Sequence, residues 1–163
     1  DLDEIIRTSV RKYARQFIAK KISLSYEPVE RTVITDKKWL SFVIEQVISN
    51  AVKYTKTGGI KIYLEDGDGT MSVPVQKASH RKEDDGENSG MKSVCLVIED
   101  TGIGIRAEDL PRICEMGYTG CNGHEGQHSS GIGLYLCSRI LKKLGHTFSI
   151  TSKEGVGTVV KIG

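Results

Sequence analysis

The chain has 163 residues, of which 38% are hydrophobic and 27% charged, values typical of a single globular domain. Its 23 basic and 21 acidic residues nearly balance, whereas a nucleic-acid-binding protein carries a dense basic patch. No apolar run approaches the roughly 18 residues that cross a bilayer, and no signal peptide opens the chain. We therefore expect a soluble domain that binds no nucleic acid.

The four cysteines are Cys95, Cys114, Cys121 and Cys137. Cys95 lies in an apolar run typical of a strand and Cys137 in an amphipathic run typical of a helix. Both are therefore predicted to be small buried hydrophobic residues. The chain contains no CxxC pair, which favours a reducing, cytosolic compartment.

Hydrophobic spacing predicts two helices and three strands in the first part of the chain. Apolar residues that recur every three or four positions indicate amphipathic helices, and alternating apolar residues indicate strands. Asp36 can cap the second helix, and Gly58-Gly59 can end it. In chain order, the predicted elements are a helix at 2–19, a strand at 22–26, a short strand around Val33, a helix from Asp36 to Gly58 and a strand at 60–64.

Residues 66–93 are polar and glycine-rich, and we expect a long flexible loop there that joins two neighbouring strands. The elements predicted beyond it are a central strand at 94–98, a short helix at 110–114, a helix at 133–144 that stops at Gly145, and strands at 147–151 and 158–162. Helices and strands alternate irregularly, with two hairpins. This order predicts an α/β fold, a two-layer sandwich with helices on one face of a mixed β-sheet.

Three clusters of residues are candidates for chemistry, and the first lies late in the second predicted helix. Asn50 and Lys53 are three residues apart and share one helix face, and Tyr54 follows them. These polar residues could line a binding site. They could equally form a stripe that faces solvent.

The second cluster directly follows the predicted central strand. Asp100 places a carboxylate there, which can accept a proton from the exocyclic amino group of a base. Gly102 and Gly104 would let a flat ring or a ribose lie against the main chain. The same residues could also form an ordinary turn.

The third cluster, Ser129-Ser130-Gly131-Ile132-Gly133-Leu134, opens a predicted helix. Free N–H groups and the positive end of the helix dipole form an anion site at such a position, although a helix start without a ligand is the alternative.

The sequence motifs of other nucleotide-binding families are absent. The chain has no GxxxxGK[ST] loop, no HRD or DFG set, and no third glycine to complete a dinucleotide fingerprint.

Taken in this order, the three clusters resemble the N, G1 and G2 boxes of sensor histidine kinases. These kinases share a superfamily with DNA gyrase, the heat-shock ATPase chaperones and the mismatch-repair ATPases. The resemblance covers about residues 36–162. Residues 113–119 are similar to a diverged F box, with Tyr118 where phenylalanine is usual, and Gly155-Val156-Gly157-Thr158 is similar to the closing glycine motif. It implies a Bergerat-type ATP-binding fold and a kinase that uses ATP and Mg²⁺.

The resemblance also implies a role for each matching residue. Asn50 would coordinate Mg²⁺ and Lys53 would pair with phosphate, which makes these two the catalytic residues. Tyr54 would pack on adenine, Asp100 would accept the adenine amino proton, and residues 106–130 would be the ATP lid. The residues implied to contact the nucleotide are Asn50, Lys53, Tyr54, Asp100, Gly102, Gly104, Ile105, Tyr118, Ser129, Ser130, Gly131, Gly133, Leu134 and Thr158.

Gln46 lies one turn before Asn50, where ATP-hydrolysing members of the superfamily carry a glutamate that activates water. Glu45 is one position away, rotated by about 100° around the helix. Because Gln46 cannot remove a proton, the resemblance implies phosphate transfer to a histidine rather than hydrolysis. The alternatives are an ATPase of the same fold, a serine kinase acting on anti-sigma antagonists, and a degenerate nucleotide-binding or docking module.

None of the four histidines, His80, His124, His128 and His146, sits in a phosphoacceptor motif with a following acid and proline. The resemblance therefore implies an upstream dimerisation and phosphoacceptor domain, and a single catalytic domain over 1–163 whose entry helix is 1–20. It implies a homodimeric protein of the cell membrane, with this domain in the cytoplasm and a response regulator as partner. Residues 46–54, 117–120 and 131–136 look closest to the bacitracin-sensing type, and this similarity implies an ABC transporter as a further partner.

Cys114, Cys121, His124 and His128 lie close together in the sequence and could suggest a tetrahedral zinc site. Six residues separate the two cysteines, whereas zinc knuckles place two to four between them. The glycines in this stretch suit a loop that reshapes around phosphates. We therefore expect a mobile lid rather than a zinc site.

Overall fold

The computed structural model describes residues 1–66, 94–120 and 130–163. The predicted loop lies outside these residues apart from Asp66, and so does the part of the predicted lid between Gly120 and Ser130. The elements, in chain order, are α1 (Leu2–Lys20), β1 (Ser23–Tyr26), α2 (Lys37–Tyr54), β2 (Gly59–Asp66), β3 (Val94–Asp100), the 3₁₀ helix η1 (Leu110–Arg112), α3 (Gly133–Leu144), β4 (Phe148–Lys153) and β5 (Gly157–Ile162).

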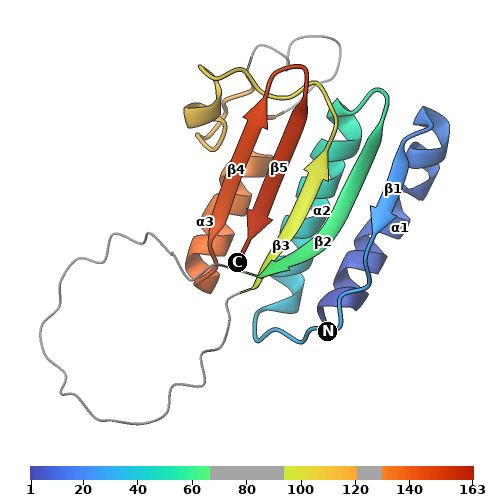
Figure 1. The fold of residues 1–163 in the computed structure, drawn as a ribbon. Helices are drawn as coiled ribbons and strands as arrows, with labels where there is room; N and C mark the ends of the chain where they lie inside the picture. Colours follow the sequence, from blue (N-terminus) through green and yellow to red (C-terminus); the bar gives the residue numbers. More distant parts are fainter. Residues whose placement is uncertain (67–93, 121–129) are drawn as a thin grey trace, which may run out of the picture.

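The five strands form one sheet in the order β1-β2-β3-β5-β4 (Figure 1). β1 and β2 pair in parallel and all other neighbours pair antiparallel, so the sheet is mixed. The three α-helices cover one face of it, with α2 in contact with both α1 and α3. The predicted two-layer sandwich is confirmed, and β3 is the central strand as expected.

Strand alternation decides which side chains reach the helices. Ile60, Ile98 and Val160, from three neighbouring strands, lie in the same buried cluster as residues of α2. The pairing register places Asp100 beside Ile60 on one side and beside Thr158 on the other. The helix-facing side of the sheet therefore changes from apolar to polar where β3 ends and β5 begins.

The opposite face of the sheet is largely polar and carries an ion pair between Lys161 and Glu65. Cys95, opposite Glu65 in the register, is only partly buried, so the prediction of a buried Cys95 is wrong. An apolar run does not show which alternate residues face the helices. Cys137 is buried as predicted.

Most helix boundaries follow local signals. Asp36 caps α2 by accepting hydrogen bonds from the backbone N–H groups of Lys38 (2.9 Å) and Trp39 (3.1 Å). Gly145 adopts φ 76° and ends α3, as predicted. No helix in the described part of the chain is long and apolar enough to cross a membrane.

One predicted strand, the predicted end of α2 and one predicted helix are wrong, and other boundaries differ by one or two residues. The segment around Val33 is not a strand, because residues 27–36 leave the edge of the sheet and cross to the start of α2 (Figure 1). α2 ends at Tyr54 rather than at Gly58-Gly59, because its last carbonyls are bonded by groups from outside the helix. The short helix predicted at 110–114 is the 3₁₀ helix η1.

Candidate functional site

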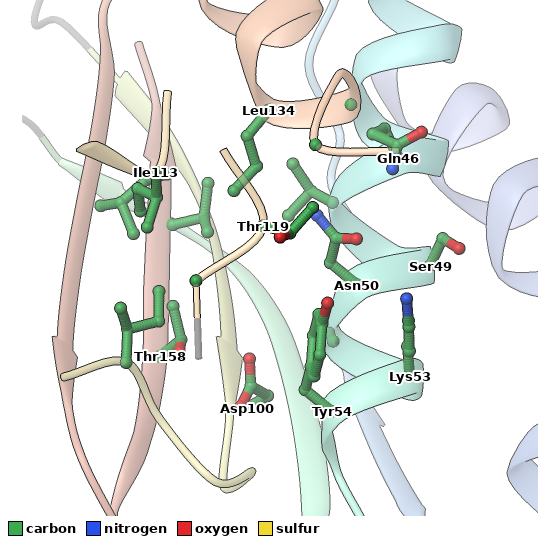
Figure 2. Close-up of a pocket in the computed structure, with 18 of the residues that line it drawn as sticks. Gln46, Ser49, Asn50, Lys53, Tyr54, Asp100, Ile113, Thr119, Leu134 and Thr158 are labelled. Atoms are coloured by element: carbon green, nitrogen blue, oxygen red, sulfur yellow. The ribbon is translucent and has the colours of Figure 1, made fainter. Parts of the chain in front are cut away.

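A cavity of about 520 Å³ lies between α2, the helix-facing side of the sheet and the start of α3 (Figure 2). All three predicted clusters contribute to its lining. Gly102 lies beside the cavity without lining it, and Ser129 lies outside the described residues. The predicted residues that line it are Asn50, Lys53, Tyr54, Asp100, Gly104, Ile105, Tyr118, Ser130, Gly131, Gly133, Leu134 and Thr158.

α2 presents a polar row to this cavity. Gln46, Asn50 and Tyr54 are four residues apart, so they stack along one face of the helix, and Figure 2 shows them one above another. The ammonium group of Lys53 lies 5.1 Å from the centre of the Tyr54 ring. These polar residues are partly buried and line the cavity instead of forming a solvent-facing stripe.

Asp100 and Asp109 are the acidic residues among those that line the cavity, and Asp100 lies where β3 ends. Burial raises the pKa of its carboxyl, and hydrogen bonds from backbone N–H groups, including that of Gly102 at 2.8 Å, oppose this rise. A desolvated carboxylate gains from any further donor. Asp100 is thus suited to accept a proton from a ligand's amino group.

The turn after Asp100 is packed too tightly for ordinary side chains. A Cβ atom on Gly102 would lie 2.7 Å from both the Asp100 carboxylate and the carbonyl oxygen of Tyr54. Gly104 adopts φ +69°, and a Cβ atom there would lie 2.1 Å from the carbonyl oxygen of Lys153. The two glycines hold this turn against both the end of α2 and the β4–β5 hairpin, which an ordinary surface turn does not need.

Ser152 organises the sheet side of the cavity. Its hydroxyl accepts a hydrogen bond from the N–H of Ile105 (2.8 Å), donates to the carbonyl of Gly157 (2.8 Å) and contacts the hydroxyl of Thr158 (2.9 Å). Sequence reasoning missed it. The available signal was alternation, because Phe148, Ile150 and Ser152 share the helix-facing side of β4.

The start of α3 closes the other end of the cavity. Its N-cap residue is Ile132, whose aliphatic side chain cannot bond the N–H groups of the first turn. A Cβ atom on Gly133 would lie 2.5 Å from the side-chain nitrogen of Gln46, so the helix start packs directly on the polar row of α2. These N–H groups and the helix dipole make this end suitable for an anion.

Tyr118 and Asp109 interact in the segment before α3. Tyr118 was among the predicted site residues, whereas Asp109 was not. The Tyr118 hydroxyl donates a hydrogen bond to Asp109, which is 6% exposed, and the guanidinium group of Arg112 lies 4.4 Å from the ring centre. Gly131 packs on this segment, and its carbonyl accepts a hydrogen bond from the N–H of Gly117 (3.0 Å). The Tyr118–Asp109 hydrogen bond thus lies within the segment after Ile105, and the contact between Gly117 and Gly131 joins this segment to the start of α3.

The residues that line the cavity fit a hard cation such as Mg²⁺ if a bound ligand supplies most of the oxygen atoms around it. Within residues 1–66, 94–120 and 130–163, no group of three or more His, Cys, Asp or Glu side chains could hold a metal ion. Asn50 offers one neutral amide oxygen, which suits Mg²⁺ because this ion takes most of its ligands from phosphates and water. Cys121, His124 and His128 lie outside the described residues, so the choice between zinc and a mobile lid stays a prediction.

The amino-acid sequence is similar to those of known histidine kinases. Residues 35–163 match the family described as "Histidine kinase-, DNA gyrase B-, and HSP90-like ATPase". The chain is 33% identical over 164 residues to "Sensor histidine kinase YxdK" of Bacillus subtilis (strain 168), covering 98% of this chain and 43% of that protein. It is 34% identical over 134 residues to "Sensor protein kinase GraS" of Staphylococcus aureus (strain MRSA252), covering 82% of this chain and 32% of that protein. The chain thus spans less than half the length of these relatives.

Two solved structures share the fold. Full-length ShkA in complex with AMPPNP superposes with a TM-score of 0.72 at 20% identity, covering 99% of this chain and 29% of that chain. The nucleotide-free catalytic domain of the histidine kinase ThkA superposes with a TM-score of 0.72 at 20% identity, covering 99% and 90%. At this level of identity the likeness concerns the fold alone.

Proposed function

This chain belongs to the family of histidine kinase-, DNA gyrase B- and HSP90-like ATPases, as an ATP-binding catalytic domain, and we propose that it donates the γ-phosphate of ATP to a histidine of a separate helical domain. The observation that carries the proposal is that the two ends of one cavity differ in their hydrogen-bonding groups. An acidic acceptor, Asp100, lies at one end, and the free N–H groups of α3 lie at the other.

The end of the cavity near Asp100 takes the adenine. Asp100 accepts the amino proton of the base, Thr158 lies beside it in the register, and the ring of Tyr54 packs on the base from α2. Gly102 and Gly104 allow the main chain to approach the base and ribose. A base with a carbonyl in place of the amino group, as in GTP, would face Asp100 acceptor to acceptor and bind more weakly by roughly 1–3 kcal/mol.

The end of the cavity near α3 takes the triphosphate. The N–H groups at the start of α3 and the ammonium group of Lys53 bind the phosphate oxygens. Asn50 would hold Mg²⁺ through its amide oxygen, and the ion when bound neutralises charge on the phosphate that is transferred. Ser130 and Leu134 border this end of the cavity.

The arrangement of α2 favours transfer over hydrolysis. Gln46 lines the cavity but has no basic group with which to activate water. Glu45, the neighbouring carboxylate, is not among the residues that line the cavity and is paired with Lys12 of α1. No general base for water therefore lines the cavity from this part of α2, which weighs against an ATPase.

The proposed acceptor lies on another domain. His146 uses both ring nitrogens within the fold, one with the Thr35 hydroxyl (2.9 Å) and one with the Gly163 carbonyl (3.1 Å). His80, His124 and His128 lie outside the described residues and outside any phosphoacceptor motif. We propose a homodimeric phosphoacceptor domain, a response regulator and an ABC transporter as partners of the whole protein, and a cytoplasmic position for this domain beside a membrane-spanning part.

The test is transfer of labelled γ-phosphate to a separately supplied phosphoacceptor domain of the same kinase. We expect Asn50→Ala to reduce transfer by at least about a hundredfold, because it removes the proposed metal ligand while it spares the adenine end. Lys161→Ala, on the polar face of the sheet, is the matched control and should leave transfer unchanged. Near-normal transfer by Asn50→Ala would remove Asn50 from the proposed mechanism. Steady-state hydrolysis well above about 0.1 per second, without transfer, would favour the ATPase.

A further inference from the structure

The C-terminal end of α2 carries the key cavity residues, and it ends without a glycine cap. An α-helix leaves its last four carbonyl groups without partners inside the helix. The N–H of Thr55 satisfies the carbonyl of Ala51 at 3.0 Å, but Thr55 itself is extended at φ −92° and ψ 114°. A left-handed residue that would bond the other carbonyls is therefore missing at this position. The carbonyls of Val52, Lys53 and Tyr54 depend on donors from elsewhere in the fold.

Lys20, in the last turn of α1, supplies most of these donors. Its ammonium group lies 2.6 Å from the carbonyl oxygen of Val52, 3.1 Å from that of Lys53 and 3.4 Å from that of Thr55. The remaining carbonyl, that of Tyr54, accepts a hydrogen bond from the N–H of Ile103 at 3.1 Å. Each of the last four carbonyls of α2 thus has a partner, and one ammonium group serves two of them.

The charge of Lys20 suits this position. The carbonyl end of a helix is the negative end of its dipole, so a cation is stabilised there. None of the ion pairs formed by the described residues involves Lys20, so its charge is directed at the carbonyls of α2. The adjacent Lys21 adopts φ 54°, and its N–H bonds the carbonyl of Ile18, which closes α1 directly after Lys20. The backbone that holds the ammonium group is thereby fixed.

We propose that Lys20 is a positioning residue for the nucleotide site. By completing the end of α2, its ammonium group fixes the turn that directs Asn50, Lys53 and Tyr54 into the cavity. Lys20 does not line the cavity, and it lies outside the residues 35–163 that match the family. The inference rests on the proposed function, because its effect is measured through ATP binding.

Coupling between Lys20 and the nucleotide site acts in both directions. If Lys20 couples the last turn of α1 to the nucleotide site, then bound ATP must stabilise that turn by the same coupling free energy by which the turn improves ATP binding. Amide hydrogen exchange near the end of α1 should therefore slow when ATP and Mg²⁺ are added to the wild-type protein. Bound ATP also stabilises the fold as a whole, so a role for Lys20 in general stability alone predicts equal slowing along α1, whereas the coupling predicts greater slowing in its last turn than in its first.

The experiment compares ATP·Mg²⁺ binding by titration calorimetry in Lys20→Met, Lys20→Arg and Lys12→Met, well below each melting temperature. Methionine keeps the apolar stem and removes the charge, so we expect Lys20→Met to weaken binding roughly tenfold through misplacement of the α2 turn. Arginine can still donate to the carbonyls and should restore affinity to within about threefold. Lys12→Met also removes an ammonium group that joins α1 to α2, at the Glu45 side chain, and should change affinity by less than about twofold.

The outcomes separate this inference from the proposed function. Wild-type affinity in folded Lys20→Met would overturn the positioning role and leave the proposed function intact. A wild-type protein that does not bind ATP·Mg²⁺ would overturn both. If Lys20→Met does not fold, hydrogen exchange in the wild-type protein decides. Slowing by ATP·Mg²⁺ that is no greater in the last turn of α1 than in its first turn would overturn the inference.

Discussion

At the scale of single residues, Asp100 links ligand recognition to stability. Burial raises the pKa of its carboxyl above the ordinary value of 3.8, so the folded state binds its proton more tightly than the unfolded state does. The contribution of Asp100 to stability is therefore greatest below pH 3.8 and is lost as the pH rises through the folded pKa. A hydrogen bond from the adenine amino group would offset this loss of stability. Without a ligand, the ionised Asp100 carboxylate lowers the free energy of unfolding.

Asp100→Asn should weaken ATP binding by roughly tenfold, because a neutral oxygen replaces a charge-assisted acceptor. It should also change the pH dependence of unfolding. The difference in free energy of unfolding between Asp100→Asn and wild type should shift in favour of the variant as the pH rises from about 3 to about 7. Titration calorimetry and urea unfolding measure the two effects.

The matched control for Asp100 is its neighbour Glu99, which alternates onto the opposite face of the sheet, beside Val159. Glu99→Gln removes a carboxylate from the same strand without touching the cavity, and should leave ATP affinity within about twofold of wild type. An Asp100→Asn protein that bound ATP as well as wild type would contradict the assignment of the adenine end.

At the scale of elements, the cavity depends on how closely the turn after Asp100 packs on the β4–β5 hairpin. Gly104 and Gly155 both have positive φ values, +69° and +74°. A Cβ atom on Gly104 would lie 2.1 Å from the carbonyl oxygen of Lys153, whereas nothing lies within 4 Å of one on Gly155. The two glycines therefore share a left-handed backbone conformation, but only Gly104 lies close to another part of the backbone.

Replacing each glycine with alanine separates these two effects. Gly155→Ala should cost about 1–2 kcal/mol, the strain of a left-handed backbone with a side chain. Gly104→Ala should cost at least about 2 kcal/mol more, because backbone must move to relieve the contact. Urea unfolding of the two variants measures the difference, and equal destabilisation would show that the approach of the turn to the hairpin is unimportant.

At the scale of the whole molecule, the cavity joins parts of the chain that are far apart in sequence. α2, β3, β5 and the start of α3 each supply one wall, so a ligand that contacts all of them binds only the folded state. Binding of this kind stabilises the fold by mass action. Thermal unfolding should therefore report occupancy of the site.

ATP·Mg²⁺ at a hundred times its dissociation constant should stabilise the protein by about 2.7 kcal/mol. For a domain of this size, that corresponds to a rise in melting temperature of about 5–10 °C. At the same concentration, Asp100→Asn should show a smaller rise and Glu99→Gln the full rise. A melting temperature that does not respond to saturating ATP·Mg²⁺ would contradict the proposed site as a whole.

Local physics made much of this fold predictable from the amino-acid sequence. α1 and α3 follow from apolar residues repeated at helical spacing, and the start of α2 follows from the Asp36 cap, because these signals act within one or two helical turns. The three clusters could be assigned to one site only through their resemblance to a family. Spacing alone left the polar stripe, the ordinary turn and the unliganded helix start as alternatives.

Only the tertiary structure decided features that depend on partners distant in sequence. Alternation identifies two faces of a strand but does not show which one meets the helices, so the environment of Cys95 was predicted wrongly. The end of α2 was predicted wrongly for a related reason. The groups that donate hydrogen bonds to its last carbonyls come from Lys20 and Ile103, which are distant in sequence, so the residues around Thr55 do not indicate that the helix ends there. Local sequence thus determined which segments form helices and strands, while long-range hydrogen bonds and packing determined where α2 ends and which side chains meet in the cavity.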